Sequence, residues 1–349
     1  MSHEVLYRKY RPQGFADVIG QDSVVKALSG AIKNKTIAHA YLFAGSRGIG
    51  KTSIARIFAR EIGTTPNDIY EIDAASNRGI DDIRALRDAV GTLPFESEFK
   101  VYIIDEVHML TKEAFNALLK TLEEPPKHVV FILATTEVYK LPETIVSRCQ
   151  VFEFKRPTVD ILKDTVMAIA EKEGFTIEPG GAELVALVGD GSFRDTHGVL
   201  ERVIAGKAGE RGTKAKIITK ADVEEATGSP RSEMVRAFVL ALATKNAQNA
   251  FAVITELRSK SSDPKLFLEL SLSLVRLLLM HKMQAGADIL AQAGEEDTVF
   301  LKTTLATPGV VVDSTLLRKI LGAFEYIGVS PLRELPLELL VLDVVGEGK

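Results

Sequence analysis

The stretch of residues 40–56 constrains the fold of this chain more than any other. It begins with a short apolar run that is typical of a buried strand, continues through a glycine-rich turn, and has a helical pattern from Ser53 onward. The turn matches Gly-x4-Gly-Lys-Thr, the pattern of a phosphate-binding loop, and a strand before it and a helix after it are the context that this pattern requires. The sequence therefore predicts a nucleotide-binding site within an α/β fold.

The residue types of this loop suit a polyphosphate ligand. Glycines let successive backbone N–H groups point toward phosphates, and the N-terminus of the following helix adds its positive dipole end. We expect Lys51 to bring a positive charge to the β- and γ-phosphates and the Thr52 hydroxyl to ligate Mg²⁺. The residues expected to contact the nucleotide here are Gly45, Gly48, Gly50, Lys51, Thr52 and Ser53.

Two carboxylates follow a second apolar run, at residues 101–104. They are Asp105 and Glu106, and they stand at the C-terminal end of an expected strand, the edge at which parallel sheets bind ligands. Hydrolysis of a Mg²⁺-bound phosphate needs one carboxylate near the metal and another to orient and activate water. We therefore expect Asp105 to hold Mg²⁺ together with Thr52, and Glu106 to act on the water.

Three further side chains are candidates. Thr136 follows another apolar strand, where a hydroxyl either senses the γ-phosphate or attacking water, or caps the strand end. Arg194 falls in the first turn of an expected helix, where a cation opposes the helix dipole, so that either nucleotide phosphate or a neighbouring aspartate explains it. Arg148 comes just before the last expected strand. The six histidines, His108 included, show no ligand spacing, and Cys149, the only cysteine, allows neither an internal disulfide nor a cysteine-based zinc site.

The pattern of apolar runs predicts how the chain is organised. Apolar runs that alternate with helical stretches favour a parallel sheet covered on both faces, so residues 1–156 are expected to form one α/β domain. Residues 157–228 have the pattern of four short helices, and residues 229–349 are helical to the end, with an apolar helix at 266–280 that is either central to its domain or packed on another subunit. Strands are expected at 40–44, 69–73, 101–105, 129–135 and 150–154, and helices near 51–62, 79–90, 112–123, 159–173, 182–189, 192–205 and 220–227.

Composition excludes several classes of protein. A formal net charge of −4 over 349 residues argues against a uniformly basic nucleic-acid binder, so any DNA contact must depend on a local patch. The apolar stretch at 266–280 is interrupted by Glu269 and Arg276 and is too short to span a bilayer. The N-terminal residues lack the apolar core of a signal peptide. These features predict a cytoplasmic protein with no membrane segment.

Several blocks of sequence together resemble the γ/τ subunits of the bacterial DNA polymerase III clamp loader, which are AAA+ ATPases. The resemblance is dense over residues 3–205 and weaker beyond, and Ser147-Arg148-Cys149 is a signature of clamp-loader subunits. It implies an α/β P-loop (AAA+) domain with a parallel sheet, a small helical lid domain and an all-α collar domain. The blocks are residues 6–13, 15–21, 39–45, 71–77, 100–110, 115–126, 133–137 and 147–149.

The resemblance implies roles for particular residues. Arg148 corresponds to the arginine finger that reaches the ATP of a neighbouring subunit, Thr136 to the sensor-1 residue, and Arg194 to the sensor-2 residue. Arg11 and Val18 would line the pocket for the base and ribose, although the basic strip around Arg11 otherwise has the appearance of a solvated surface. The implied function is ATP binding and hydrolysis that opens the sliding clamp and loads it onto primer–template DNA.

The resemblance also implies partners. The collar would hold five subunits in a ring with δ- and δ′-type subunits, and the assembly would bind the sliding clamp and primer–template DNA. Arg78, Arg84 and Arg87 are candidate DNA phosphate contacts, or else an ordinary solvated helix face. Residues 62–69 contain no cysteine where relatives carry a four-cysteine zinc module, so ATP and Mg²⁺ are expected as cofactors and zinc is not. Because the chain ends at the collar, we expect a γ-length form without the additional τ domains.

Two alternatives remain. The first is another AAA+ DNA-processing ATPase, for branch migration or helicase loading, and the blocks at 115–126 and 147–149 argue against it. The second is a non-catalytic structural subunit of the loader. The full set of Lys51, Thr52, Asp105 and Glu106 argues against this, because a structural subunit does not need it.

Overall fold

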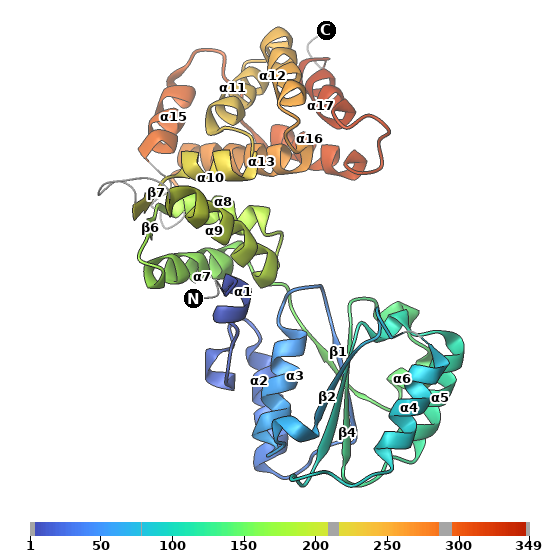
Figure 1. Cartoon of the computed structure of the whole chain (residues 1–349). Coiled ribbons are helices and arrows are strands. Elements are labelled where there is room, and N and C mark those ends of the chain that lie inside the picture. The colour runs from blue at the N-terminus through green and yellow to red at the C-terminus, as the bar shows by residue number, and fades with distance from the viewer. Residues whose placement is uncertain (1–3, 78, 209–215, 286–294, 347–349) are drawn as a thin grey trace. The chain divides into compact units, whose positions relative to one another are not determined.

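The computed structural model describes residues 4–77, 79–208, 216–285 and 295–346 (Figure 1). The chain divides into two compact units, one formed by Met1–Leu162 with Gly189–Gly198 and the other by Lys163–Val188 with Val199–Lys349. The border between them falls within the helices α7 (Val159–Lys172) and α9 (Phe193–Ala208). The division into three domains at 156 and 228 stays a prediction.

The first unit is built on a parallel sheet of five strands in the order β2-β3-β4-β1-β5. Every residue of two inner strands, β1 and β4, is buried, which explains why these strands appear in the sequence as unbroken apolar runs. The expected strands are confirmed to within one residue at each end. Their bounds are β1 (Ala40–Ala44), β2 (Ile69–Asp73), β3 (Lys100–Asp105), β4 (Val129–Thr135) and β5 (Gln150–Glu153).

Helices cover both faces of this sheet (Figure 1). Successive strand residues point to opposite faces, so Tyr41 and Phe43 of β1 pack in a cluster with α2 and α3, while Ala40 and Leu42 pack in a second cluster with α4, α5 and α6. The expected helices near 51–62, 79–90 and 112–123 are confirmed with small shifts of their ends. The helices are α2 (Asp22–Lys33), α3 (Lys51–Glu61), α4 (Ile80–Val90), α5 (Lys112–Glu123) and α6 (Glu143–Val146).

Side-chain hydrogen bonds hold the connecting segments of the first unit in place. The Gln21 side chain donates to the Lys155 carbonyl at 2.7 Å and accepts from the Lys155 N–H at 3.1 Å, which joins the N-terminal segment to the residues after β5. Asp68 is fully buried and accepts hydrogen bonds from the backbone N–H groups of the loop before β3. The short elements are α1 (Leu6–Lys9), η1 (Phe15–Asp17), η2 (Pro66–Asp68), η3 (Val107–Met109) and η4 (Val138–Lys140).

The second unit is mainly helical. One feature of it was not expected, a parallel pair of two-residue strands, β6 (Thr176–Ile177) and β7 (Ile217–Ile218), which are too short to produce a periodic signal. Thr219 and Asp222 form a capping box at the start of α10. The helices are α8 (Pro179–Val188), α10 (Lys220–Thr227), α11 (Ser232–Ala243), α12 (Ala247–Ser259), α13 (Pro264–Lys282), α15 (Glu295–Ala306), α16 (Ser314–Ala323), η6 (Phe324–Tyr326) and α17 (Leu335–Gly346).

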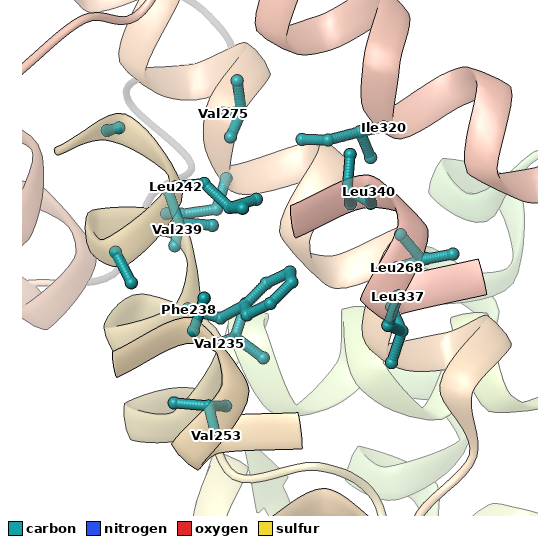
Figure 2. Packing of buried hydrophobic residues seen from close by; sticks show 14 of the residues in the cluster. Val235, Phe238, Val239, Leu242, Val253, Leu268, Val275, Ile320, Leu337 and Leu340 are labelled. Carbon is teal, nitrogen blue, oxygen red and sulfur yellow. The ribbon is translucent and has the colours of Figure 1, made fainter. Parts of the chain in front are cut away.

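The apolar helix α13 is central to the core of the second unit (Figure 2). Its Phe267 is fully buried, and the ring centroids of Phe267 and of Phe238 on α11 are 5.0 Å apart. Leu268 and Val275 of the same helix contribute to a cluster that also contains side chains of α12, α16 and α17. This is one of the two arrangements expected for it. Within the described ranges, no helix combines the length and the apolar character needed to cross a membrane.

Candidate functional site

The loop between β1 and α3 has the backbone conformation that its glycines permit. Gly50 precedes the helix with φ of 104° and Gly48 has φ of 74°, both in the left-handed region that other residues avoid. A Cβ atom on Gly48 would also lie 2.0 Å from the Ser192 hydroxyl oxygen. Glycine at position 48 is therefore required both by the backbone and by the close approach of the segment that leads into α9.

Lys51 lies inside this loop. Its ammonium group donates to the carbonyl oxygens of Gly45 and Ser46, each at 2.7 Å, and only 5% of the residue is exposed. Burial lowers the pKa of Lys51 and nearby Arg194 lowers it further, whereas Glu106 and Asp105 act in the opposite direction. A buried cation is costly unless it is paired, so the loop favours an anionic ligand such as a phosphate.

Thr52 and Asp105 come together although they are far apart in the sequence. The Thr52 hydroxyl donates to Asp105 Oδ2 at 2.7 Å, and Asp105 Oδ1 accepts from the Glu106 N–H at 2.9 Å. A hydroxyl beside a carboxylate is a set of hard oxygen donors that fits Mg²⁺, which is usually bound through one or two carboxylates together with waters and substrate phosphates. In the described part of the chain, no group of three or more His, Cys, Asp or Glu side chains is arranged for a metal. The expected absence of zinc stays a prediction.

Glu106 stands at the same edge of the sheet. It follows β3 with φ of 50°, a left-handed turn that ends the strand and begins η3, and its side chain is 29% exposed. Because β4 lies beside β3, the Thr136 hydroxyl reaches Glu106 and donates to its Oε2 at 3.1 Å. The neighbouring Thr135 accepts from the Glu137 N–H at 3.0 Å. Thr135 therefore caps the strand end, whereas Thr136 contacts the Glu106 carboxylate.

Two arginines belong to the same region. The Arg194 N–H, in the first turn of α9, donates to the Gly48 carbonyl at 3.4 Å, which places the start of this helix against the loop. Burial lowers the pKa of Arg11, and repulsion from Arg56 and Arg194 lowers it further. Asp190, one of the aspartates near Arg194 in the sequence, forms an ion pair with Arg156 at 3.3 Å.

Two other residues, Val18 and Ser53, are also candidates for contact with the nucleotide. Val18 is half-buried and packs with the cluster beneath α2 and α3. Ser53 is half-buried in the first turn of α3. Both positions are compatible with the expected pocket, and their roles stay predictions.

Arg148 is separated from this set. Its guanidinium donates to Glu123 Oε1 at 2.9 Å and to the Thr144 carbonyl at 2.8 Å. These partners belong to α5 and α6, which cover one face of the sheet, whereas Lys51 begins α3 on the opposite face (Figure 1). The geometry does not bring Arg148 to the chain's own phosphate loop. Its action on the ATP of a neighbouring subunit stays a prediction.

The three DNA candidates are in or near α4. Arg78 lies outside the described residues, and Arg84 and Arg87 belong to α4. Their contact with DNA stays a prediction.

One residue of the site was missed in the sequence. His108, in η3, has only 5% of its side chain exposed and lies against Glu106, Thr135 and Glu137. Its position two residues after Glu106 was the only signal, and it matches no ligand motif. Cys149 has the properties of a structural side chain. Burial raises its pKa to about 11, which keeps the thiol protonated and unreactive.

The sequence is similar to subunits of bacterial DNA polymerase III. A family model described as the delta subunit of DNA polymerase III matches residues 20–71 and 63–158. The chain is 39% identical over 329 residues to the tau subunit of DNA polymerase III from Bacillus subtilis (strain 168), covering 88% of this chain and 57% of that protein. It is 39% identical over 308 residues to the tau subunit from Escherichia coli (strain K12), covering 82% of this chain and 47% of that protein. The chain thus spans about half the length of these relatives.

A further relative and a solved structure also match this chain. The gamma subunit of DNA polymerase III from Buchnera aphidicola subsp. Baizongia pistaciae is 40% identical over 241 residues, with 63% of this chain and 65% of that protein covered. Among solved structures, the Thermotoga maritima RuvB Holliday junction branch migration motor matches with a TM-score of 0.54 and 23% identity, covering 88% of this chain and 97% of RuvB. This likeness concerns the fold alone, and it agrees with the expected α/β fold with a parallel sheet followed by helices.

Proposed function

Because this chain is a homologue of the gamma and tau subunits of bacterial DNA polymerase III, we propose that it binds ATP with Mg²⁺ and hydrolyses it as a subunit of the clamp loader. The observation that supports this most directly is the convergence of Lys51, Thr52, Asp105 and Glu106 at one edge of the sheet. Parallel sheets bind ligands at this edge, and these side chains are those that phosphoryl transfer requires.

In the proposed mechanism the protein mainly positions groups and neutralises charge. Lys51 and the backbone N–H groups of the loop bind the β- and γ-phosphates of ATP. Thr52 and Asp105 would hold Mg²⁺, which when bound reduces the negative charge on these phosphates. Glu106 accepts a proton from water as the water oxygen attacks the γ-phosphorus and ADP leaves, and the hydrogen bond from Thr136 keeps its carboxylate in place.

The basic residues complete the proposed site. Arg194 lies beside the loop, and we propose that it contacts the γ-phosphate of the bound ATP. Arg11 and Val18 would contact the base and ribose. We assign Arg148 to the ATP of a neighbouring subunit, where its planar guanidinium would stabilise charge in the transition state.

The proposal extends to partners and location. Residues 229–349 would form a collar that assembles this chain with δ- and δ′-type subunits in a ring of five. The ring would open the sliding clamp and hold primer–template DNA in the cytoplasm, with Arg78, Arg84 and Arg87 as phosphate contacts. Similarity at 39% to the two tau subunits supports this assignment over a branch-migration motor, since the similarity to RuvB concerns the fold.

Steady-state ATP hydrolysis tests this function. The purified chain would be mixed with the other loader subunits of its organism and measured with and without the sliding clamp and primed DNA, beside a Lys51→Ala control. We expect strong stimulation that requires both clamp and DNA. Hydrolysis that is indifferent to the clamp would indicate an ATPase with another target, and no hydrolysis under any condition would refute the proposed activity.

A further inference from the structure

His108 links the ends of two neighbouring strands next to the proposed catalytic carboxylate. Its Nδ1 atom lies 3.0 Å from Thr135 Oγ1 and 3.5 Å from Glu106 Oε2, and its Nε2 atom lies 3.1 Å from Glu137 Oε2. With 5% of its side chain exposed, the ring makes these contacts largely out of water. It therefore contacts the base and the segment that holds the base.

The contacts of the ring select one tautomer. Hydrogen bonds from the Lys140 and Tyr139 side chains lower the pKa of Glu137, so its carboxylate is ionised and can only accept. The ring nitrogen facing it, Nε2, must then carry a hydrogen. In the neutral ring Nδ1 is unprotonated and accepts the Thr135 hydroxyl hydrogen, while the oxygen of the same hydroxyl accepts the Glu137 N–H.

This tautomer matters for Glu106. A hydrogen on Nδ1 would point toward Glu106 Oε2, 3.5 Å away, and would compete with water for the lone pairs that a general base needs. With the hydrogen on Nε2, the ring presents no donor to the carboxylate and still packs beside it. Glu106 is then oriented by Thr136 on one side and by the ring on the other.

We propose that His108 is a positioning residue for Glu106, and that Glu137 acts through it by keeping the ring in the Nε2–H form. This inference rests on the proposed function, because it assigns His108 to the same hydrolysis reaction. The Glu137 carboxylate fixes the tautomer of His108, as carboxylates do for metal-binding histidines. The tautomer then determines whether the ring donates a hydrogen bond to Glu106.

Four variants test the inference by hydrolysis in the assembled loader. His108→Ala and Glu137→Gln should each lower kcat by about tenfold. This is the smaller of the losses usually found when a residue that orients a functional group is removed. The double variant should be no slower than either single one, because both changes interrupt the same chain of contacts. Tyr139→Phe is the matched control, since it removes another hydrogen bond to Glu137 and leaves the ring contact, and it should keep kcat within twofold.

Binding and spectroscopy separate this role from a structural one. The affinity for a non-hydrolysable ATP analogue should equal that of the wild type in all four variants, which also shows that they fold. Nitrogen NMR of ¹⁵N-labelled histidine, with His108 assigned from its loss in His108→Ala, should show the Nε2–H tautomer in the wild type. In Glu137→Gln the population should shift toward Nδ1–H, because a glutamine can donate to Nε2.

Two results would overturn the inference while leaving the proposed function intact. One is a hydrolysing wild type whose His108→Ala variant turns over at the same rate. The other is a wild-type ring in the Nδ1–H form, or a tautomer that does not change in Glu137→Gln. A wild-type chain that binds its partners and never hydrolyses ATP would instead overturn the proposed function itself.

Discussion

Replacement of Arg148 by alanine should separate stability from catalysis. In this chain the guanidinium contacts Glu123 and the Thr144 carbonyl, and the side chains of Arg148 and Glu123 are 34% and 50% exposed. An exposed ion pair contributes roughly 0–1 kcal/mol, and one further hydrogen bond contributes about 1 kcal/mol. The variant should therefore lose at most about 2 kcal/mol of stability. It should bind ATP normally, because Arg148 lies on the face of the sheet opposite α3.

The effect on catalysis in the assembled complex should be far larger. An arginine finger contributes about 10³–10⁵ to kcat, equivalent to about 4–7 kcal/mol of transition-state stabilisation. The assays are urea unfolding and ATP-analogue binding by the chain alone, followed by hydrolysis in the loader with clamp and primed DNA. Arg148→Lys keeps the charge without the planar fork and should stay strongly impaired, whereas Glu123→Gln removes only the local partner and should retain turnover. An Arg148→Ala complex within a few-fold of the wild-type rate would refute the finger assignment.

Three other predictions address the site and its support. Lys51→Ala should abolish ATP binding measured by calorimetry, and unchanged affinity would contradict the phosphate-loop assignment. Thr52→Val should raise the Mg²⁺ concentration for half-maximal hydrolysis by about tenfold, because a metal-ligating oxygen is lost, and an unchanged Mg²⁺ titration would exclude it from the metal site. Asp68→Asn should destabilise the protein by about 2–3 kcal/mol at neutral pH, because an amide cannot accept from all the backbone N–H groups that the carboxylate faces. Burial by itself would raise the pKa of Asp68, but these N–H donors lower it from 3.8 to about 2, so the stabilisation is complete above pH 3.8 and is lost as the pH falls through 2. Urea unfolding over this range should show wild type and variant converging in acid, and a constant difference would contradict the assignment.

The sheet and the phosphate loop could be predicted from local sequence because their causes are local. A strand covered on both faces needs an unbroken apolar run, and a phosphate loop needs glycine where the backbone enters the left-handed region, as at Gly48 and Gly50. Short elements cannot be predicted in this way, because they contain too few residues to show a hydrophobic pattern. The two-residue strands β6 and β7 have no period to detect, and their pairing joins residues that are far apart in the sequence, such as Thr176 and Ile217.

Resemblance to a family added what spacing could not show. The roles expected for Arg148, Arg194 and Arg11 came from matching blocks of sequence, and each role still awaits its experiment. The structure contributes their placement. Arg194 and Arg11 lie in one region with Lys51, and Arg148 lies on another face of the sheet.

The sequence by itself determined which side chains of the candidate site stand at strand ends, because motif and hydrophobic period are properties of neighbouring residues. Only the tertiary structure decided which of them meet. The order β2-β3-β4-β1-β5 places β4 between the strands that carry the phosphate loop and Glu106, and this order depends on pairing between distant segments. For that reason the contacts of Thr52 with Asp105, of Thr136 with Glu106 and of His108 with Glu137 could not be derived from spacing alone.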